Sequence, residues 1–432
     1  MEFVDAKTVV RPAKWQEGVF ATMNLEVNSS AFIEKPLERL QSLENKQEVL
    51  ICAYCFRFIG DMKKSVQLLT GEMNRQEVIT NSNQNCKIDH SCISSPNHVY
   101  CNPITCRDQC GEIYCSVNCS DTHWKESHHK LCTGCITEEE AQTHPLIAFK
   151  LHACQTNEIF LMAADIFSKI VVQIEEAGNT GNSLELALNK ACLPYSNYVR
   201  PKWWDAVANC DDQLKQTLIK LVTEAWYLLD SVLGLSVKGL SHVLSIDYLA
   251  ETIGMFERNN VGIRLTNKTG KIISRTNKEE EEKYLETVKQ IVRRQEAMQT
   301  YDSEDMEEEE LEEELEDEDE GEYEDEEDEE DAKTLQGYIE QKGGIDAIFP
   351  PAEGAAFYLH ICKINHSCEP NVQVLYDENA SGMIARVEVI RPIATDEELL
   401  HSYVDCNAPK EERAAALLEY GIICECNKCA RE

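Results

Sequence analysis

The sequence predicts an α+β fold that carries separate cysteine-rich, metal-binding modules. Short strand-like runs lie between residues 17 and 48 and recur between 345 and 432. Apolar residues at helical spacing run through residues 138–300. Eleven of the twenty cysteines fall within residues 52–135, and a second cysteine cluster lies near the carboxyl end. These observations predict a core of small strands, a helical region and at least two metal-binding segments.

The predicted elements follow in order along the chain. The first strands are Gly18–Ala21 and Ser30–Ile33. The adjacent tryptophans Trp203 and Trp204 are predicted to fill a core. Glu279–Thr300 is predicted to form an amphipathic helix with charged faces. A further helix is predicted from four residues at helical spacing, which are Leu214, Leu218, Leu221 and Ala225.

The composition excludes several classes of protein. A chain of 432 residues can form two or three domains, and it has no apolar run of the roughly 18 residues that a membrane span needs. The segment Met1–Asp5 carries acidic residues and no signal-like apolar run follows it, so we expect a protein of the nucleus, the cytoplasm or both. Cysteines in such a protein are expected to bind metal rather than to form disulfides. No basic stripe is present, so direct nucleic-acid binding is not expected.

Acidic residues are concentrated in one segment. The chain has 78 acidic and 41 basic residues, for a net charge of −37. Residues 302–331 hold 24 of the acidic ones, and without them the net charge is −13. We predict that this segment is disordered, because it has too little apolar surface to offset the entropy of ordering. Two uses stay open, a solvated spacer and a docking site that attracts basic partners such as histone tails.

A first set of eight donors predicts two closed zinc sites. Four short pairs each deliver two donors from one turn of chain, and tetrahedral zinc takes four thiolate or imidazole donors. Closed coordination leaves no position for water, so these ions would be structural. The donors are Cys52, Cys55, Cys106, Cys110, Cys115, Cys119, His128 and Cys132.

The segment from Tyr114 to Cys132, with His123-Trp124 inside it, resembles a MYND finger, a cross-braced zinc module that binds protein partners. The resemblance implies that the first and third pairs share one zinc and that the second and fourth pairs share the other. A RING-type module is the alternative, but its central Cys-x-His pair is missing. His129 competes with His128 as a ligand, and the spacing to Cys132 favours His128.

One departure from the MYND pattern is the long gap after Cys55. It contains four more candidate donors, which could hold another metal or belong to an insertion with spare thiols. These donors are Cys86, His90, Cys92 and Cys101.

A second set of thiols lies at the end of the chain. Cys424, Cys426 and Cys429 supply three donors and need a fourth from elsewhere. Cys368 is the natural fourth donor, which would attach the tail to the segment Asn365–Asn371.

The motif Asn-His-Ser-Cys-x-Pro-Asn at 365–371, followed by Ser-Tyr-x-Asp at 402–405, resembles the SET domain of protein-lysine methyltransferases with its post-SET cysteines. Together with the finger, the chain resembles the SET-and-MYND methyltransferases, in the branch of plant trithorax-related SET proteins. Gly254–Asn260 and Lys202–Asp205 also match that branch. The resemblance implies a SET β-fold core with an inserted MYND finger, helical insertions and a zinc-binding post-SET segment.

The resemblance also implies a reaction, the transfer of a methyl group from S-adenosylmethionine to a lysine amine. Tyr403 matches the catalytic tyrosine, and Tyr420 matches the aromatic residue that lines the lysine channel. Two departures concern the cofactor, since Gln16 replaces a glycine and Ile422 replaces an aromatic residue. The matched cofactor-binding positions are Glu17, Gly18, Asn259, Asn365 and His366.

The sequence therefore predicts a methyltransferase with three zinc ions that acts on an exposed lysine of a histone tail or another basic protein. The finger would take a peptide partner, and no membrane is involved. A catalytically silent scaffold with the same finger is the alternative. The predicted division of the chain is 1–48 and 345–405 for the two parts of the SET core, 52–135 for the finger, 138–300 for the helical and SET-associated region, 302–331 for the acidic tract and 406–432 for the post-SET segment.

Overall fold

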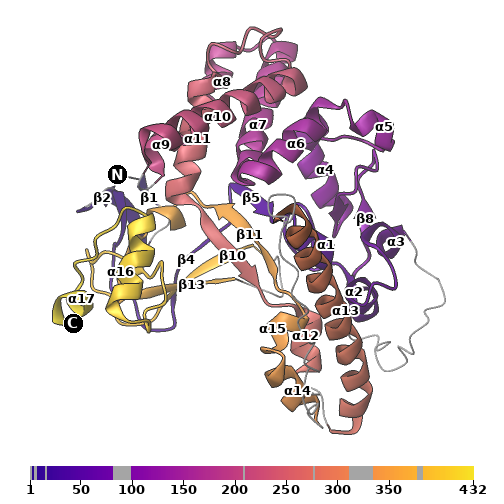
Figure 1. Ribbon diagram of the computed structural model, residues 1–432. Coiled ribbons are helices and arrows are strands. Elements are labelled where there is room, and N and C mark those ends of the chain that lie inside the picture. The colour runs from indigo at the N-terminus through magenta and orange to yellow at the C-terminus, as the bar shows by residue number, and fades with distance from the viewer. Residues whose placement is uncertain are drawn as a thin grey trace.

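A computed structural model describes residues 2–3, 7–14, 17–80, 99–207, 210–275, 278–310, 334–376 and 383–432 (Figure 1). Its helices are α1 (Asn45–Glu48), α2 (Met62–Leu69), α3 (Arg75–Thr80), α4 (Val117–Glu126), α5 (Glu138–Ala141), α6 (Pro145–Thr156), α7 (Ile159–Thr180), α8 (Leu184–Cys192), α9 (Trp203–Ala206), α10 (Asp212–Leu233), α11 (Ile246–Asn259), α12 (Lys268–Ile273), α13 (Lys278–Glu310), α14 (Leu335–Gln341), α15 (Ile345–Ile348), α16 (Lys410–Glu419) and α17 (Asn427–Arg431). Its strands are β1 (Glu2–Phe3), β2 (Thr8–Pro12), β3 (Glu17–Ala21), β4 (Ser30–Glu34), β5 (Glu38–Gln41), β6 (Gly60–Asp61), β7 (Val99–Cys101), β8 (Ile104–Thr105), β9 (Ile113–Tyr114), β10 (Val261–Leu265), β11 (Ala352–Phe357), β12 (Asn365–His366), β13 (Val372–Tyr376), β14 (Ala385–Val389) and β15 (Leu400–His401).

The sheets join segments from the two ends of the chain. Strand β5 pairs with β11, with Glu38 opposite Phe357, and β11 pairs with β10. Strand β4 pairs with β14, which pairs with β13, and both of these sheets are antiparallel. The two-stranded sheet of β12 and β15 is parallel and sets His366 opposite His401. Because these pairings connect the beginning of the chain to its end, the finger and the helices between them are insertions into one strand framework.

A layer of helices covers one side of the strands (Figure 1). The predicted helix around Leu218 is confirmed as α10, which buries Leu218 and Ala225. It begins after Asp211, whose side chain accepts a hydrogen bond from the N–H of Leu214 at 2.7 Å, and such a cap satisfies an otherwise unpaired amide. The predicted burial of the adjacent tryptophans is also confirmed, since both are less than 10% exposed. No helix in the described part of the chain has the length and apolar composition needed to cross a membrane.

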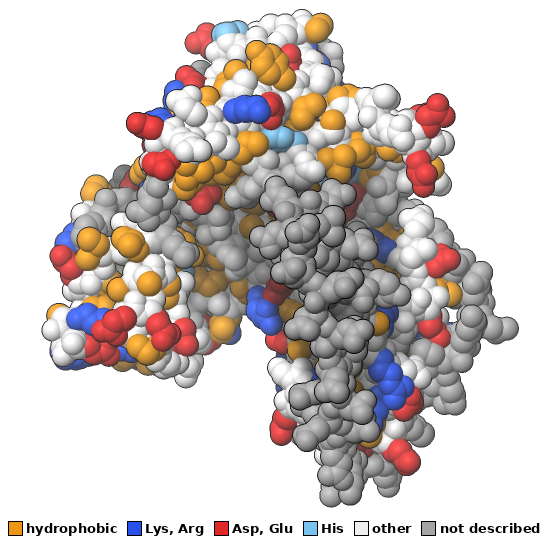
Figure 2. Space-filling model, in the orientation of Figure 1, with side chains coloured by type: hydrophobic (Ala, Val, Ile, Leu, Met, Phe, Trp, Pro, Cys, Tyr) orange, Lys and Arg blue, Asp and Glu red, His pale blue; other side chains and the backbone are white. Residues whose placement is uncertain are grey.

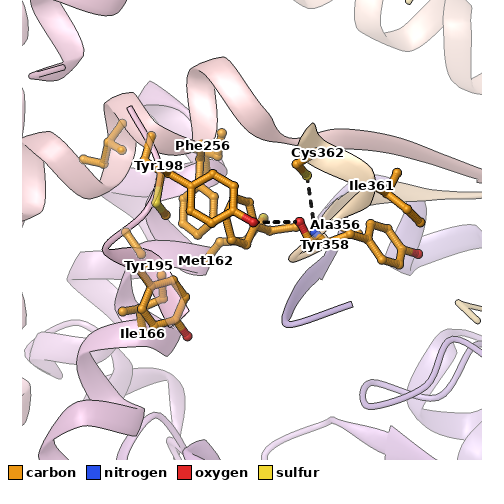
Figure 3. Packing of buried hydrophobic residues seen from close by; sticks show 14 of the residues in the cluster. Met162, Ile166, Tyr195, Tyr198, Phe256, Ala356, Tyr358, Ile361 and Cys362 are labelled. Carbon is orange, nitrogen blue, oxygen red and sulfur yellow. Dashed lines mark hydrogen bonds between the residues drawn. The ribbon is translucent and has the colours of Figure 1, made fainter. Parts of the chain in front are cut away.

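Strands and helices share one hydrophobic core (Figure 3). The Phe357 ring of β11 lies 5.5 Å from the Phe256 ring of α11 and 4.7 Å from the Tyr198 ring, measured between centroids. The Tyr198 hydroxyl donates to the carbonyl of Leu359, so this buried phenol is satisfied. Tyr358 donates its N–H to the Cys362 sulfur at 3.3 Å. These contacts fix the start of the segment that leads to β12.

Two lobes project from this core, one with α16 and α17 and the other with α12–α15, and the surface is indented between them (Figures 1 and 2). In the second lobe, α13 buries Val288 and Ile291 in a separate apolar cluster with α2, α14 and α15. The strands β10 and β11 run between the two lobes (Figure 1).

Two sequence predictions need correction. Residues 138–300 are not helical throughout, because Val261–Leu265 form β10, and its pairing with the distant β11 overrides the local helical pattern. The acidic tract is not disordered from its first residue, because α13 continues to Glu310. Extending an existing helix needs no new nucleus, and glutamate is a good helix former. The rest of the tract, 311–331, lies outside the described residues.

The backbones of β11 and β5 approach each other closely at Gly354. A Cβ atom there would lie 1.9 Å from the Leu40 carbonyl oxygen, whereas a Cβ atom at Gly262, on the neighbouring β10, would meet nothing within 4 Å. We expect Gly354→Ala to lower the free energy of unfolding by about 3 kcal/mol, because backbone must move to relieve the overlap. Gly262→Ala is the matched control and is expected to change it by less than about 0.5 kcal/mol. Equal denaturation midpoints for the two variants would contradict this account.

Candidate functional site

The structure brings the eight predicted donors of the finger into two clusters, in the pairing that the resemblance implied. In each cluster the four ligand atoms lie within 4.8 Å of one another. Ser116 caps α4 by accepting a hydrogen bond from the N–H of Cys119 at 3.1 Å, which holds Cys119 beside Cys115. The clusters are Cys52, Cys55, Cys115 and Cys119, and Cys106, Cys110, His128 and Cys132.

The contacts of the ring nitrogens show which of the neighbouring histidines, His128 or His129, belongs to the second cluster. The Nε2 atom of His128 lies 3.3 Å from the sulfur atoms of both Cys106 and Cys110. The Nδ1 atom of His129 instead lies 2.7 Å from the carbonyl oxygen of Trp124. His128 is therefore the member of the cluster. Of the four other candidate donors nearby, Cys101 is half-buried on β7, and Cys86, His90 and Cys92 lie outside the described residues.

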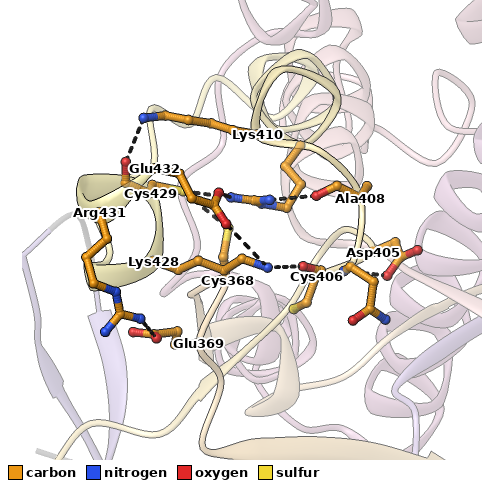
Figure 4. Close-up of polar contacts among 12 residues, drawn as sticks. Cys368, Glu369, Asp405, Cys406, Ala408, Lys410, Lys428, Cys429, Arg431 and Glu432 are labelled. Carbon is orange, nitrogen blue, oxygen red and sulfur yellow. Dashed lines mark hydrogen bonds and ion pairs between the residues drawn. The ribbon is translucent and has the colours of Figure 1, made fainter.

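The tail forms a third cluster, and Cys368 is its fourth member. The Cys368 sulfur lies 3.9 Å from that of Cys424 and 3.6 Å from that of Cys429, and Cys426 completes the group. Around this cluster, Arg413 is only 2% exposed and donates to the Cys429 sulfur at 3.6 Å. Lys410 donates to the carbonyl of Cys429 at 2.7 Å (Figure 4). Cations of this kind stabilise thiolates and hold the tail in place.

The geometry of the three clusters fits zinc. A tetrahedral zinc with bonds of about 2.3 Å to sulfur places its sulfur ligands about 3.8 Å apart. The neighbouring sulfur atoms lie 3.5 Å apart for Cys55 and Cys115, 3.7 Å for Cys106 and Cys132, and 3.6 Å for Cys368 and Cys429. The clusters thus have both the donor types and the spacing of closed structural zinc sites.

Tyr403 and Tyr420 line the same cavity, of about 590 Å³. Their ring centroids are 5.7 Å apart. The Tyr403 hydroxyl donates to the Ile364 carbonyl oxygen at 2.8 Å, and burial raises the pKa of this phenol, so its proton stays in place. The oxygen lone pairs of Tyr403 are then left as hydrogen-bond acceptors.

The described lining of the cavity mixes polar and apolar side chains and contains no carboxylate. Burial lowers the pKa of His401 to about 4, so this ring is uncharged at neutral pH. Arg258 is the charged member among the described lining residues, and its guanidinium donates to the Tyr420 carbonyl at 2.8 Å. No carboxylate belongs to this described lining. A nearby carboxylate would keep a lysine amine protonated, so the lining favours a neutral amine.

His366 connects the tail cluster to Tyr403. Its Nδ1 atom accepts a hydrogen bond from the Tyr403 backbone N–H at 3.0 Å, and its Nε2 atom lies 3.3 Å from the Cys368 sulfur. With Nδ1 as the acceptor, Nε2 carries the proton and donates to the sulfur. The side chain of His366 thus faces Tyr403 and the cluster, whereas the sequence assigned it to the cofactor.

Other predicted cofactor positions do come together. The side-chain Nδ2 atom of Asn365 donates to a Glu398 carboxylate oxygen at 2.7 Å and to the Glu17 carbonyl at 3.3 Å. A Cβ atom at Gly18 would lie 2.4 Å from the same carboxylate and 3.1 Å from Asn365 Nδ2, so only glycine fits there without displacement. The Asn365 Oδ1 atom is left as an acceptor, which suits the ammonium group of an amino-acid cofactor.

The remaining cofactor positions are more dispersed. Asn259 donates to the Met255 carbonyl at 2.7 Å and lines the Tyr403 cavity. Ile422 is half-buried after α16, and Gln16 lies outside the described residues.

Sequence reasoning missed three residues of the site. Glu398 binds Asn365, Arg413 contacts the tail cluster, and Lys363 is 4% exposed and lies 3.1 Å from the Glu17 carboxylate. No local spacing identifies them, because each acts on a residue distant in the sequence. Glu398 lies in the acidic run before Tyr403, which is the one signal that could have pointed to it.

Comparisons with known proteins agree with this geometry. Residues 260–404 match the family model of the SET domain. The chain is 24% identical to histone-lysine N-methyltransferase ATXR2 of Arabidopsis thaliana over 96% of this chain and 88% of that protein. It is 23% identical to protein-lysine N-trimethyltransferase SMYD5 of Gallus gallus over 96% of this chain and 83% of that protein. It is 38% identical to N-lysine methyltransferase SMYD2 of Homo sapiens, over 18% of this chain and 17% of that protein.

Proposed function

We propose, from the premise that this chain is a SET-domain protein-lysine methyltransferase of the SET-and-MYND type, that the Tyr403 cavity receives the lysine side chain of a protein substrate. The observation that carries the proposal is the joint position of Tyr403 and Tyr420 on one cavity, beside the Cys368 cluster. In this proposal the two parts of the SET core flank the finger and the helical insertion.

S-adenosylmethionine would supply an electrophilic methyl group when bound. Gly18, Glu17, Asn365 and His366 are the residues that would hold it, with Asn259 as a further position. The close fit of Gly18 against Asn365 supports this assignment. The Gln16 and Ile422 departures would correspond either to looser cofactor binding or to loss of the activity, and the labelling test below distinguishes the two.

The chain's own residues have three tasks. They must present a neutral amine, which costs about 4 kcal/mol at neutral pH for a lysine with a pKa of about 10.4. A lining that has the Arg258 cation and no described carboxylate lowers that cost. They must also orient the amine, and the Tyr403 hydroxyl oxygen, fixed by Ile364, is the acceptor that would do so. The third task is to exclude water, which the aromatic and aliphatic residues of the lining would perform.

We further propose that each of the three clusters binds one structural zinc ion, as the sulfur spacing supports. The substrate would be a histone tail or another basic protein, in the nucleus or the cytoplasm, and the finger would bind a peptide partner.

The test is transfer of label from radiolabelled S-adenosylmethionine. Purified protein is incubated with core histones and, separately, with cell lysate, and labelled proteins are resolved by electrophoresis. We expect a labelled basic protein. The absence of both labelling and calorimetrically measurable cofactor binding would overturn the proposal and favour the scaffold.

A further inference from the structure

A second hollow, of about 660 Å³, adjoins the Tyr403 cavity. It lies over the sheet of β5, β10 and β11, and its lining shares Asn260 and Gly262 with the lining of the Tyr403 cavity. Because the two hollows have lining residues in common, they are neighbours, and the second one is here called the sheet groove.

The floor of the sheet groove is made of small side chains in register. Gly262 lies opposite Ala355, and Ala355 lies opposite Leu40 on the next strand. Gly262 is exposed, and a Cβ atom there would meet nothing within 4 Å. The floor therefore leaves room for an extended segment with side chains.

The walls of the groove carry an excess of carboxylates. Glu353 is compensated by Arg264, which also contacts Asp346. Neither Glu158 nor Glu257 forms an ion pair with another described residue, although Arg258 lies close enough to Glu257 to oppose the effect of burial on its pKa. The remaining charge of the groove is therefore negative.

Glu158 is held in place by a hydrogen bond, and Glu257 is half-buried. A Glu158 oxygen accepts a hydrogen bond from the Leu43 N–H at 2.8 Å. Glu158 also immediately precedes α7, where the positive end of the helix stabilises an ionised carboxylate. Glu257 is half-buried at the end of α11, and burial raises its pKa although the neighbouring Arg258 acts in the opposite direction, so a further cation beside Glu257 would relieve the cost of its charge.

We propose that the sheet groove binds the substrate segment next to the target lysine and selects an arginine or lysine in that segment through Glu158 and Glu257. This inference rests on the proposed function, because it takes the Tyr403 cavity as the lysine site. Continuity with that cavity and the complementary charge identify the occupant as a flanking peptide segment. The groove thus narrows the substrate class to lysines that have a basic neighbour.

The test uses pairs of short peptides that contain one lysine and differ only in a flanking residue, arginine or glutamine, placed one to three positions on either side. Methyl transfer gives kcat and KM, and fluorescence anisotropy gives peptide affinity without turnover. We expect the best arginine peptide to have a kcat/KM roughly tenfold above its glutamine partner, through KM.

Glu257→Gln and, independently, Glu158→Gln are expected to reduce that preference at least roughly threefold, with kcat on the glutamine peptide unchanged. The matched control is Glu185→Gln, which removes the same charge from an exposed position on α8 and is expected to keep the preference. Equal anisotropy affinities for the arginine and glutamine peptides, or equal effects of all three variants, would overturn the groove.

The two proposals fail separately in this design. If methyl transfer occurs without any preference for arginine, the methyltransferase proposal stands and the proposed role of the sheet groove is wrong. If arginine peptides bind more tightly, Glu257→Gln weakens that binding and no peptide is methylated, the proposed role of the sheet groove stands and the methyltransferase proposal is wrong.

Discussion

Replacing Tyr403 with phenylalanine is expected to lower methyl transfer at least roughly 100-fold, a loss comparable to that of one preorganised hydrogen-bonding group at a reaction centre. The substitution removes only the oxygen that Ile364 fixes at 2.8 Å on the cavity. The ring stays, so its packing against Tyr420 and His401 is retained. The loss should therefore appear in kcat, while the fold and the zinc content are unchanged.

The measurement is single-turnover transfer from labelled cofactor, together with the melting temperature. Tyr227→Phe is the control. Tyr227 is 62% exposed on α10, so this substitution removes the same hydroxyl group at a position away from the cavity. A Tyr403→Phe protein that transfers methyl groups at the wild-type rate would show that this hydroxyl has no role in the reaction.

Replacing Cys368 with serine is expected to reduce the zinc content from three ions per chain to two and to abolish transfer. One lost thiolate opens the third cluster, and structural zinc contributes directly to folding free energy. The sulfur also faces the Nε2 atom of His366, whose Nδ1 atom holds the Tyr403 backbone. Loss of the cluster is therefore expected to disturb the position of Tyr403 through the His366 side chain.

Metal content is measured by mass spectrometry on protein purified with a defined zinc supply, and far-ultraviolet circular dichroism reports whether the remainder folds. Cys406→Ser is the matched control, since Cys406 lies in the same carboxyl-terminal lobe and belongs to none of the three clusters. Three zinc ions in the Cys368→Ser protein would mean that this sulfur is no ligand.

The donor residues were predictable because zinc imposes a local rule. Two donors from one turn must be two to four residues apart, so the pairs of the finger and the thiols Cys424, Cys426 and Cys429 are visible in the sequence. Cys368 was found by the need for a fourth donor. The shared cavity of Tyr403 and Tyr420 was expected from the resemblance alone.

Other features depend on partners far away in the chain. Val261–Leu265 became a strand because β11 offers it an edge. His366 turned toward Cys368 and Tyr403, which no spacing encodes. Glu398 was fixed by Asn365, and Arg413 was buried against the tail cluster. The residue type alone does not predict a role for any of these side chains. The role follows from the distant residues that each side chain contacts.

The sequence by itself identified the donor pairs and the helical insertion, because donor spacing and helical periodicity depend on residues close together in the chain, and the motifs of the proposed reaction were identified by family resemblance. The tertiary structure alone decided how β5 meets β11, which cavity Tyr403 faces and where the sheet groove carries its charge. Those outcomes depend on burial and on pairing between the two ends of the chain, and the free energy of such contacts exists only once the chain has folded.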